Sequence, residues 1–309
     1  MSVRACSLTA LLGVLTLAPF GQAQDLAPRA YVIPPVNSNA LTWSYSFSDG
    51  SVSTDPIVPV IDAHAHFHML SLSYFHSFGL LGRTSSITIA LPYVIGNFRG
   101  TPLTSTLPAQ AHRSGLTDAR IRFSMNLKGG PSMNTEEYSR WSEGRLLGFS
   151  LTVVPPTGQY DAARLISLGY NRWSIKPEIG YSRHLSNWIL DSYAGVWFYT
   201  TNNRSYPGDS LLTQKPVYAG ELHLSYAVKP RLWFSFDGNL WVGGLSTVNG
   251  VENTEMEINS RAGVTVSIPL KGHWSTKVSY SLGAYSTIGG DFQRVSAALQ
   301  YSWIGTKWR

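Results

Sequence analysis

The sequence predicts an all-β protein, a transmembrane antiparallel up-and-down β-barrel of about 12 strands with one short periplasmic helix. Three observations favour this fold. Of the 309 residues 12% are aromatic and only 14% are charged, whereas typical soluble domains have roughly 25% charged residues. Apolar and polar residues alternate with period two in many segments, which is typical of half-buried strands. An N-terminal segment has the features of a secretory leader, and it contains the only cysteine, Cys6.

Residues 1–23 are predicted to be a signal peptide. Arg4 precedes an apolar run from Leu8 to Leu17, and small residues lead to a cleavage point near Ala23. Cleavage removes Cys6, so no disulfide is expected in the mature chain. No composition shift divides the remainder, so residues 24–309 are expected to form one barrel domain.

The charge of the chain excludes one class of partner. The formal net charge is +6, and the basic residues are scattered without forming a run. We therefore expect no nucleic-acid binding, and at most a modest attraction toward anions or lipopolysaccharide phosphates.

The alternation is clear in the segment "ALTWSYSFS" at 40–48, where Trp43 and Tyr45 share one face while Ser44 and Ser46 share the other. In a barrel strand, alternate side chains meet lipid and lumen, and about 9 to 11 residues cross the hydrocarbon. Strand cores with this pattern are predicted at 39–47, 60–78, 84–96, 117–128, 145–155, 172–182, 188–200, 215–228, 231–243, 257–268, 274–285 and 293–303.

The connections between these strands differ in length, and this difference predicts an orientation. Short connections are expected at 79–82, 183–187, 229–231 and 270–273, and long polar loops at 97–116, 156–171, 201–215 and 243–255. In such barrels short turns face the periplasm and long loops face the exterior, so both termini are predicted to be periplasmic. The connection 129–144 contains Asn134 and, three residues later, Glu137, which predicts a capped helix over about 135–142.

Several stretches resemble a known family. They are "SYFHSFGLLGRTSSITIALPYVIG" at 73–96, "PTGQYDAARLISLGYNRWSIKPEIGYS" at 156–182, "WILDSYAGVWFYTTN" at 188–202 and "VNG" at 248–250. Together they resemble the transporter-annotated outer-membrane family described as "putative MetA-pathway of phenol degradation". The resemblance implies an outer-membrane barrel, in some members encoded with aromatic-degradation pathways, and it brings no catalytic residues.

Alternation also predicts which side chains point into the lumen. A charge on the lipid face costs about 2 to 4 kcal/mol near the membrane midplane, so charged residues are assigned inward. Their mixture of signs allows two hypotheses. The charges form a network of ion pairs that ties the wall together and plugs a narrow lumen, or they line a permeation path. Inward aromatic rings either fill the interior or offer stacking surfaces to a solute. The predicted substrate pathway comprises Arg120, Arg122, Lys176, Glu178, Asp191, Tyr193, Trp197, Glu221, Trp233, Asp237, Arg261, Lys277 and Arg294.

The stretch "VIDAHAHFHM" at 60–69 places Asp62, His64, His66 and His68 at every second position. Two histidines on one strand face are compatible with an ion site, but metallohydrolases with His-x-His pairs are built from βα units, which this sequence lacks. No metal site is predicted. Counting back from the turn at Gly79 leaves two alternatives: a bulge near Met69 switches faces, or the histidines point outward at the outer rim.

A second motif suggests an enzyme. The segment "YSRHLSNW" at 181–188 resembles the His-x-Ser-Asn motif of outer-membrane phospholipase, which would make His184 a base and Ser186 a nucleophile beside Asn187. These residues lie in a turn assigned to the periplasmic end, whereas that enzyme's site faces the exterior. We therefore predict no catalytic residues.

The sequence predicts an outer-membrane channel of a Gram-negative bacterium for the passive passage of small molecules, such as aromatic or hydrophobic ones. The alternatives are a phospholipase-like hydrolase and a non-conducting structural or adhesive barrel. The expected partners are outer-membrane lipid and lipopolysaccharide, the barrel-assembly machinery and small-molecule solutes. No cofactor is expected.

Overall fold

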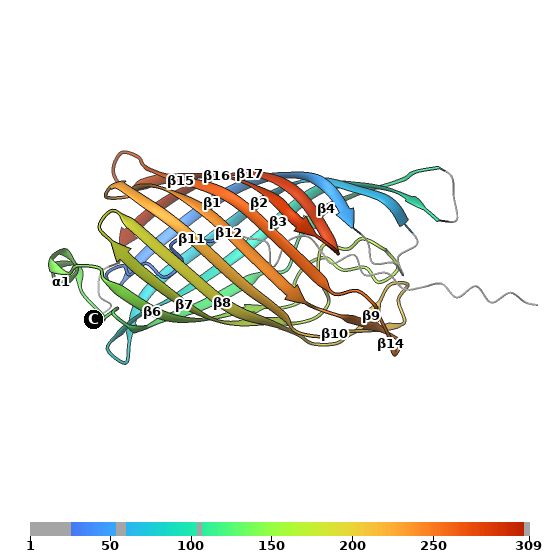
Figure 1. Ribbon diagram of the computed structural model, residues 1–309, viewed down its shortest axis with the longest axis horizontal. Helices are drawn as coiled ribbons and strands as arrows, with labels where there is room; N and C mark the ends of the chain where they lie inside the picture. The colour runs from blue at the N-terminus through green and yellow to red at the C-terminus, as the bar shows by residue number, and fades with distance from the viewer. Residues whose placement is uncertain (1–25, 54–59, 104–106, 306–309) are drawn as a thin grey trace, which may run out of the picture.

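The described residues of the computed structural model, 26–53, 60–103 and 107–305, form a closed antiparallel β-barrel (Figure 1). It has twelve strand positions, which confirms the predicted fold. The barrel strands are β1 (Ser38–Ser53), β2 (Val60–Leu80), β3 (Arg83–Pro102), β5 (Arg120–Lys128), β6 (Arg145–Val154), β7 (Ser174–Leu185), β8 (Trp188–Tyr199), β11 (Val217–Lys229), β12 (Leu232–Gly243), β15 (Glu257–Pro269), β16 (Trp274–Ser286) and β17 (Gly289–Ile304).

The first and last strands close the barrel. β1 pairs with β17 without a break from Ser38 opposite Ile304 to Ser53 opposite Gly289. Each other barrel strand pairs with the barrel strands before and after it. Closure leaves no unpaired edge among the twelve barrel strands, which allows this wall to lie in lipid. No helix among the described residues is long and apolar enough to cross a membrane.

The two ends of the barrel differ, as the sequence predicts. One end, here called the short-turn end, carries tight turns and the helix α1 (Thr135–Arg140) (Figure 1). The Asn134 side chain accepts from the Glu137 amide and the Glu137 side chain accepts from the Asn134 amide, so the predicted capping box is present. The helix is two residues shorter than expected. The opposite end is here called the long-loop end.

Three of the predicted long loops contain strands instead. β3 continues to Pro102, and β4 (Ala109–Leu116) pairs with it from Gly100 opposite Ala109 to Tyr93 opposite Leu116. The expected loop 97–116 is therefore wrong over most of its length. β9 (Asn202–Ser205), β10 (Ser210–Gln214), β13 (Ser246–Val248) and β14 (Val251–Glu252) form a small separate sheet at the long-loop end. The polar composition of these segments hid their pairing.

The outer face carries the apolar surface that the alternation predicts. Trp43, Tyr45, Ile179 and Tyr181 are exposed on it, whereas Ser48, between outward positions of β1, is fully buried. Because exposed apolar side chains on every second position suit a lipid environment, the strands have the two-sided pattern of a membrane barrel.

The pairing of β2 shows on which face of the barrel wall His64, His66 and His68 lie. Its pairing with β3 is regular from His64 onward, and its irregularity lies between Ile61 and His64 rather than near Met69. Ala65 and Phe67 are buried inside the barrel, so the histidines point outward with Leu70 and Leu72. The outward alternative is thereby confirmed. His68 Nδ1 lies 2.7 Å from the Tyr45 hydroxyl, and His66 Nε2 lies 3.0 Å from Asn97 Nδ2.

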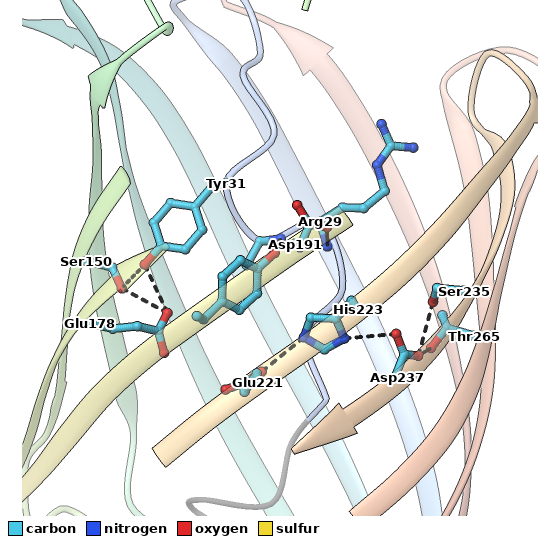
Figure 2. A network of polar contacts seen from close by, with 12 residues as sticks. Arg29, Tyr31, Ser150, Glu178, Asp191, Glu221, His223, Ser235, Asp237 and Thr265 are labelled. Atoms are coloured by element: carbon cyan, nitrogen blue, oxygen red, sulfur yellow. Dashed lines mark hydrogen bonds and ion pairs between the residues drawn. The ribbon is translucent and has the colours of Figure 1, made fainter. Parts of the chain in front are cut away.

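The chain before β1 is not outside the barrel. The segment 26–37, here called the N-terminal plug, runs from the short-turn end into the lumen (Figure 2). Tyr31 and Ile33 have exposed fractions of 3% and 1%, and Ile33 packs with Met133 and Leu146 at the short-turn end. The predicted signal peptide, 1–23, lies outside the described residues.

Candidate functional site: the barrel lumen

The thirteen residues predicted to face the lumen do point inward, and most of them contact one another or the N-terminal plug. The ion pairs begin at Glu178, whose carboxylate lies 3.0 Å from Arg122 Nη2 and 2.6 Å from Lys176 Nζ. Lys176 also lies 3.6 Å from Glu221. Opposite charges on β5, β7 and β11 therefore form a connected network across the inner wall.

Tyr31 is the centre of the plug. Its hydroxyl donates to Glu178 Oε1 at 3.0 Å and lies 3.0 Å from Ser150 Oγ. The Arg122 guanidinium lies over its ring at 5.0 Å, and its ring meets that of Tyr193 edge to face at 5.1 Å. A buried phenol with both its ring and its hydroxyl occupied is held in one position.

Two glycines of the barrel wall leave space for the Tyr31 ring. Gly148 of β6 and Gly180 of β7 are direct partners in the sheet. A Cβ atom would lie 2.2 Å from the Tyr31 ring at Gly148 and 2.1 Å from it at Gly180, a separation that no side chain tolerates. The two glycines therefore form a slot, and β6 and β7 could not accept Tyr31 with any larger residue there.

The plug backbone is also bound. The Arg29 amide donates to Asp191 Oδ2 at 3.2 Å, two residues labelled in Figure 2. The Ala30 amide donates to the Tyr193 hydroxyl at 3.0 Å. The Arg29 guanidinium lies 5.4 Å from the Trp233 ring, and Lys277 Nζ lies 5.5 Å from the same ring. Backbone and side-chain contacts together fix the plug against β8 and β12 of the lumen wall.

A second polar cluster lies beside the plug. His223 has no exposed surface, and its Nδ1 lies 2.9 Å from Asp237 and its Nε2 3.3 Å from Glu221 (Figure 2). Ser235 and Thr265 donate to the other Asp237 oxygen at 3.1 and 2.7 Å. Both histidine nitrogens therefore face carboxylates, and Asp237 is held by three groups.

Above the plug, toward the long-loop end, lies a cavity of about 320 Å³, here called the lumen chamber. Leu26 of the plug and Leu168 of the loop 155–173 both line it. The guanidinium-bearing residues Arg120 and Arg294 line it together with many serines. The serines of the wall are Ser44, Ser46, Ser71, Ser279, Ser281 and Ser296. The chamber is thus a hydroxyl-rich space with basic groups and a few apolar side chains.

The loop 155–173 closes the chamber toward the long-loop end. Leu168 has an exposed fraction of 6% and packs against Phe67, Phe98 and Phe292 of the wall. Asp118, between β4 and β5, accepts from the Gly158 amide at 2.7 Å and from the Tyr170 amide at 2.8 Å. One carboxylate thus binds both arms of the loop and holds it folded inward.

Asp118 is itself buried, and this affects its proton affinity. Burial raises the pKa of its carboxyl above the ordinary value, although hydrogen bonds from the backbone amides of Gly158, Tyr170 and Thr157 act in the opposite direction. The inward position of the loop therefore depends on a group whose titration is shifted upward.

The remaining predicted pathway residues also lie on the inner wall. Trp197 packs with Val154, Val217 and Trp241 below the small sheet, and Lys176 Nζ lies 5.5 Å from the Trp197 ring. Arg261 Nη1 donates to Ser281 Oγ at 3.1 Å and to the Phe292 carbonyl at 3.0 Å. Arg294 Nε donates to Ser48 Oγ at 2.9 Å. These contacts support the ion-pair and hydrogen-bond network over most of the wall.

The residues of the phospholipase-like motif lie elsewhere. His184 Nε2 is 3.0 Å from the Glu143 carboxylate, and Ser186 has a positive φ of 58° in the turn between β7 and β8. The Asn187 side chain donates to the Tyr226 hydroxyl at 3.4 Å. The motif therefore forms a tight turn at the short-turn end. In the part of the chain that the structure describes, no group of three or more His, Cys, Asp or Glu side chains is placed to hold a metal ion.

Three central residues escaped the sequence analysis. Arg29 and Tyr31 precede the first strand, where alternation gives no information about placement. His223 was grouped with the scattered histidines, although it lies two residues from Glu221 on β11 and opposite Asp237 on β12. The shared parity of Glu221 and His223 is the signal that could have revealed it.

Comparison with known proteins supports the same architecture. The family model described as "Putative MetA-pathway of phenol degradation" matches residues 47–295. A crystal structure titled as the COG4313 outer membrane channel from Pseudomonas putida F1 is 18% identical, with a TM-score of 0.75, and the match covers 90% of this chain and all of that one. No sequence in the curated set of proteins matches the chain significantly.

Other solved barrels are more distant. The transport unit of the autotransporter AIDA-I from Escherichia coli is 12% identical with a TM-score of 0.48, and the match covers 91% of this chain and 93% of that one. The β domain of the Bordetella autotransporter BrkA is 12% identical with a TM-score of 0.47, and the match covers 86% of this chain and 99% of that one.

Proposed function

Because the chain belongs to the family described as "Putative MetA-pathway of phenol degradation", we propose that it is a channel for the passive passage of small molecules, including aromatic and hydrophobic ones, across the outer membrane of a Gram-negative bacterium. One observation carries the proposal: a chamber of about 320 Å³ lies in the lumen, between the N-terminal plug and the loop 155–173. A chamber bounded by a plug and by a loop is suited to admit and release solute when either of them is displaced.

The lining of the chamber supports small solutes with both polar and apolar parts. Serine hydroxyls offer hydrogen bonds around the wall, while Met69, Val94 and Leu168 offer apolar contact. The basic residues Arg120 and Arg294 favour solutes with an oxygen-rich group over cations. The predicted substrate pathway thus runs along the inner wall and past the plug.

The orientation follows from the barrel ends. The short-turn end carries α1, the start of β1 and the end of β17, and it faces the periplasm. The long-loop end faces the exterior. Assembly requires the barrel-assembly machinery, and the outer rim contacts lipopolysaccharide. The signal peptide, 1–23, directs export before this step.

Planar-bilayer recording tests the channel. The purified protein is expected to give single-channel conductance, and proteoliposomes are expected to swell in small phenolic solutes faster than in sugars of larger size. Absence of both conductance and swelling, in the full-length protein and in a variant that lacks the plug, would contradict the proposal.

A closed structural barrel is the second candidate, and the fitted slot for Tyr31 favours it, since a tightly packed plug blocks passage. Removal of residues 26–33 from the mature chain distinguishes the two. A channel gains conductance on removal of the plug, whereas a purely structural barrel loses stability without conducting solute.

We propose that the protein is not an enzyme. The phospholipase alternative requires a reactive serine at Ser186, so the test is phospholipid hydrolysis in detergent by the wild type and by Ser186→Ala. Hydrolysis that is present in the wild type and absent in Ser186→Ala would contradict this part of the proposal.

A further inference from the structure

An apolar pocket lies at the long-loop end, outside the lumen chamber. It has a volume of about 160 Å³ and is here called the rim pocket. Its walls come from the extended ends of β1, β2, β3 and β4 and from Leu165 and Ile166 of the loop 155–173. The loop therefore separates the two cavities, with Ile166 on the rim pocket and Leu168 on the chamber.

The inner face of the strand extension explains why the pocket is apolar. Ala65 and Phe98 are opposite one another in the sheet, and Ala111 of β4 lies opposite Phe98. Ala65 and Phe98 have exposed fractions of 1% and 5%, and both belong to the apolar cluster that holds Leu168. The small alanine side chains leave the space that larger residues would fill.

The polar residues at the pocket have structural contacts. Arg113 Nε donates to the Ile166 carbonyl and Arg113 Nη1 to the His112 carbonyl, each at 2.8 Å. The guanidinium thus fixes the loop segment that forms the outer wall. His64, which also lines the pocket, lies 3.8 Å from Asp49. The charged groups support the walls, and the interior offers mainly aliphatic and small apolar surface.

Size selects the ligand class. An apolar cavity of about 150 Å³ in another protein stays dry and binds benzene. The rim pocket has almost the same volume, so its size suits one unfused ring. An apolar interior also disfavours a carboxylate, because burial of an unpaired charge carries a large desolvation penalty.

We propose that the rim pocket binds uncharged single-ring aromatic molecules at the long-loop end. The loop that closes the chamber also forms one wall of the pocket, so a ring bound there contacts Ile166. Leu168, two residues later in the same loop, lines the chamber. The inference deepens the proposed function. Passage of the bound ring into the chamber rests on that function. Binding itself requires no conduction.

Fluorobenzene is a suitable probe, because its binding to the full-length protein in detergent is measurable by 19F nuclear magnetic resonance. We expect saturable binding by the wild type and at least a tenfold weaker binding by Ala111→Phe, whose added ring fills the pocket. The matched control Ala262→Phe places the same ring on the exposed face of β15 and is expected to bind as the wild type does. The anion 4-fluorobenzoate is expected to bind much more weakly than fluorobenzene.

A second pair of variants avoids the barrel strands. Ile166→Asp introduces a charge at the pocket wall and is expected to abolish binding, whereas Ala163→Asp, at an exposed position of the same loop, is expected to retain it. Equal binding by the wild type, Ala111→Phe and Ile166→Asp would overturn the proposal, as would a preference for 4-fluorobenzoate.

The outcome is separable from that of the proposed function. Binding that Ala111→Phe and Ile166→Asp remove, in a protein that never conducts, would support the rim pocket and contradict the channel. Conductance without any pocket-dependent binding of fluorobenzene would support the channel and contradict the rim pocket.

Discussion

The Tyr31 hydroxyl donates a hydrogen bond to the Glu178 carboxylate over 3.0 Å, although the two residues are 147 positions apart in the chain. Glu178 belongs to the barrel wall, and Tyr31 belongs to the plug that crosses the lumen. This bond therefore joins the ion-pair network of the wall to the plug.

Tyr31→Ala is expected to release the plug. The substitution removes the ring that fills the slot and the hydroxyl that contacts Glu178 and Ser150, so the open state is favoured and conductance rises severalfold. Tyr31→Phe keeps the ring and is expected to give an intermediate effect. Single-channel recording measures both, and a conductance of Tyr31→Ala equal to that of the wild type would show that the plug does not limit passage.

Gly180→Ala is expected to have the same effect from the side of the wall. The new Cβ would lie 2.1 Å from the Tyr31 ring, so the ring must leave the slot. The control Gly220→Ala lies on β11, where a Cβ meets nothing within 4 Å. Since both changes act on one contact, Gly180→Ala and Tyr31→Ala are expected to be non-additive in a double variant. Additive increases in conductance would argue against the slot.

His223→Ala is expected to destabilise the barrel. The substitution leaves the Asp237 and Glu221 carboxylates without their shared partner, and loss of one partner from a buried ionic pair costs about 3–5 kcal/mol. Urea unfolding in lipid vesicles, followed by tryptophan fluorescence, measures the change in midpoint. His112→Ala, at an exposed outward position, is the control and is expected to unfold as the wild type does.

The loop 155–173 is expected to respond to pH through Asp118. Burial raises the pKa of this carboxyl in the closed loop, whereas an open loop leaves the carboxyl in water with its ordinary pKa. The closed loop therefore binds the proton more tightly, and closure is favoured as the pH falls and weakened as it rises through the raised pKa. Single-channel open probability is expected to be lower at acid pH than at neutral pH.

The matched variant for this pH effect is Asp118→Asn, which cannot ionise and is expected to remove the difference between acid and neutral pH. An unchanged pH response in Asp118→Asn would assign the response to another group. A higher open probability at acid pH in the wild type would show that loss of the carboxylate's hydrogen bonds outweighs the effect of its burial.

Strand positions and faces were predictable because period-two alternation follows directly from the two environments of a barrel wall. This is why Lys176 and Glu178 were placed inward. The helix after Asn134 was predictable from a separate signal, the capping pair of Asn134 and Glu137. The plug was not predictable, since Tyr31 has no strand periodicity and its binding slot consists of two glycines distant from it in the chain. The extension of β3 was missed because Arg99 and Gly100 resemble loop residues, although backbone pairing with β4 accounts for them.

The position of Leu26 has a practical consequence for protein engineering. Leu26 lines the lumen chamber, so any affinity tag or fluorescent fusion placed directly ahead of it starts within the pore. The chain after β17 differs, because the Gly305 amide donates to the Asn37 carbonyl at the short-turn end, away from the lumen chamber. Purification tags therefore belong at the C-terminus, and electrical recordings made with an N-terminally tagged protein would report the tag as well as the pore.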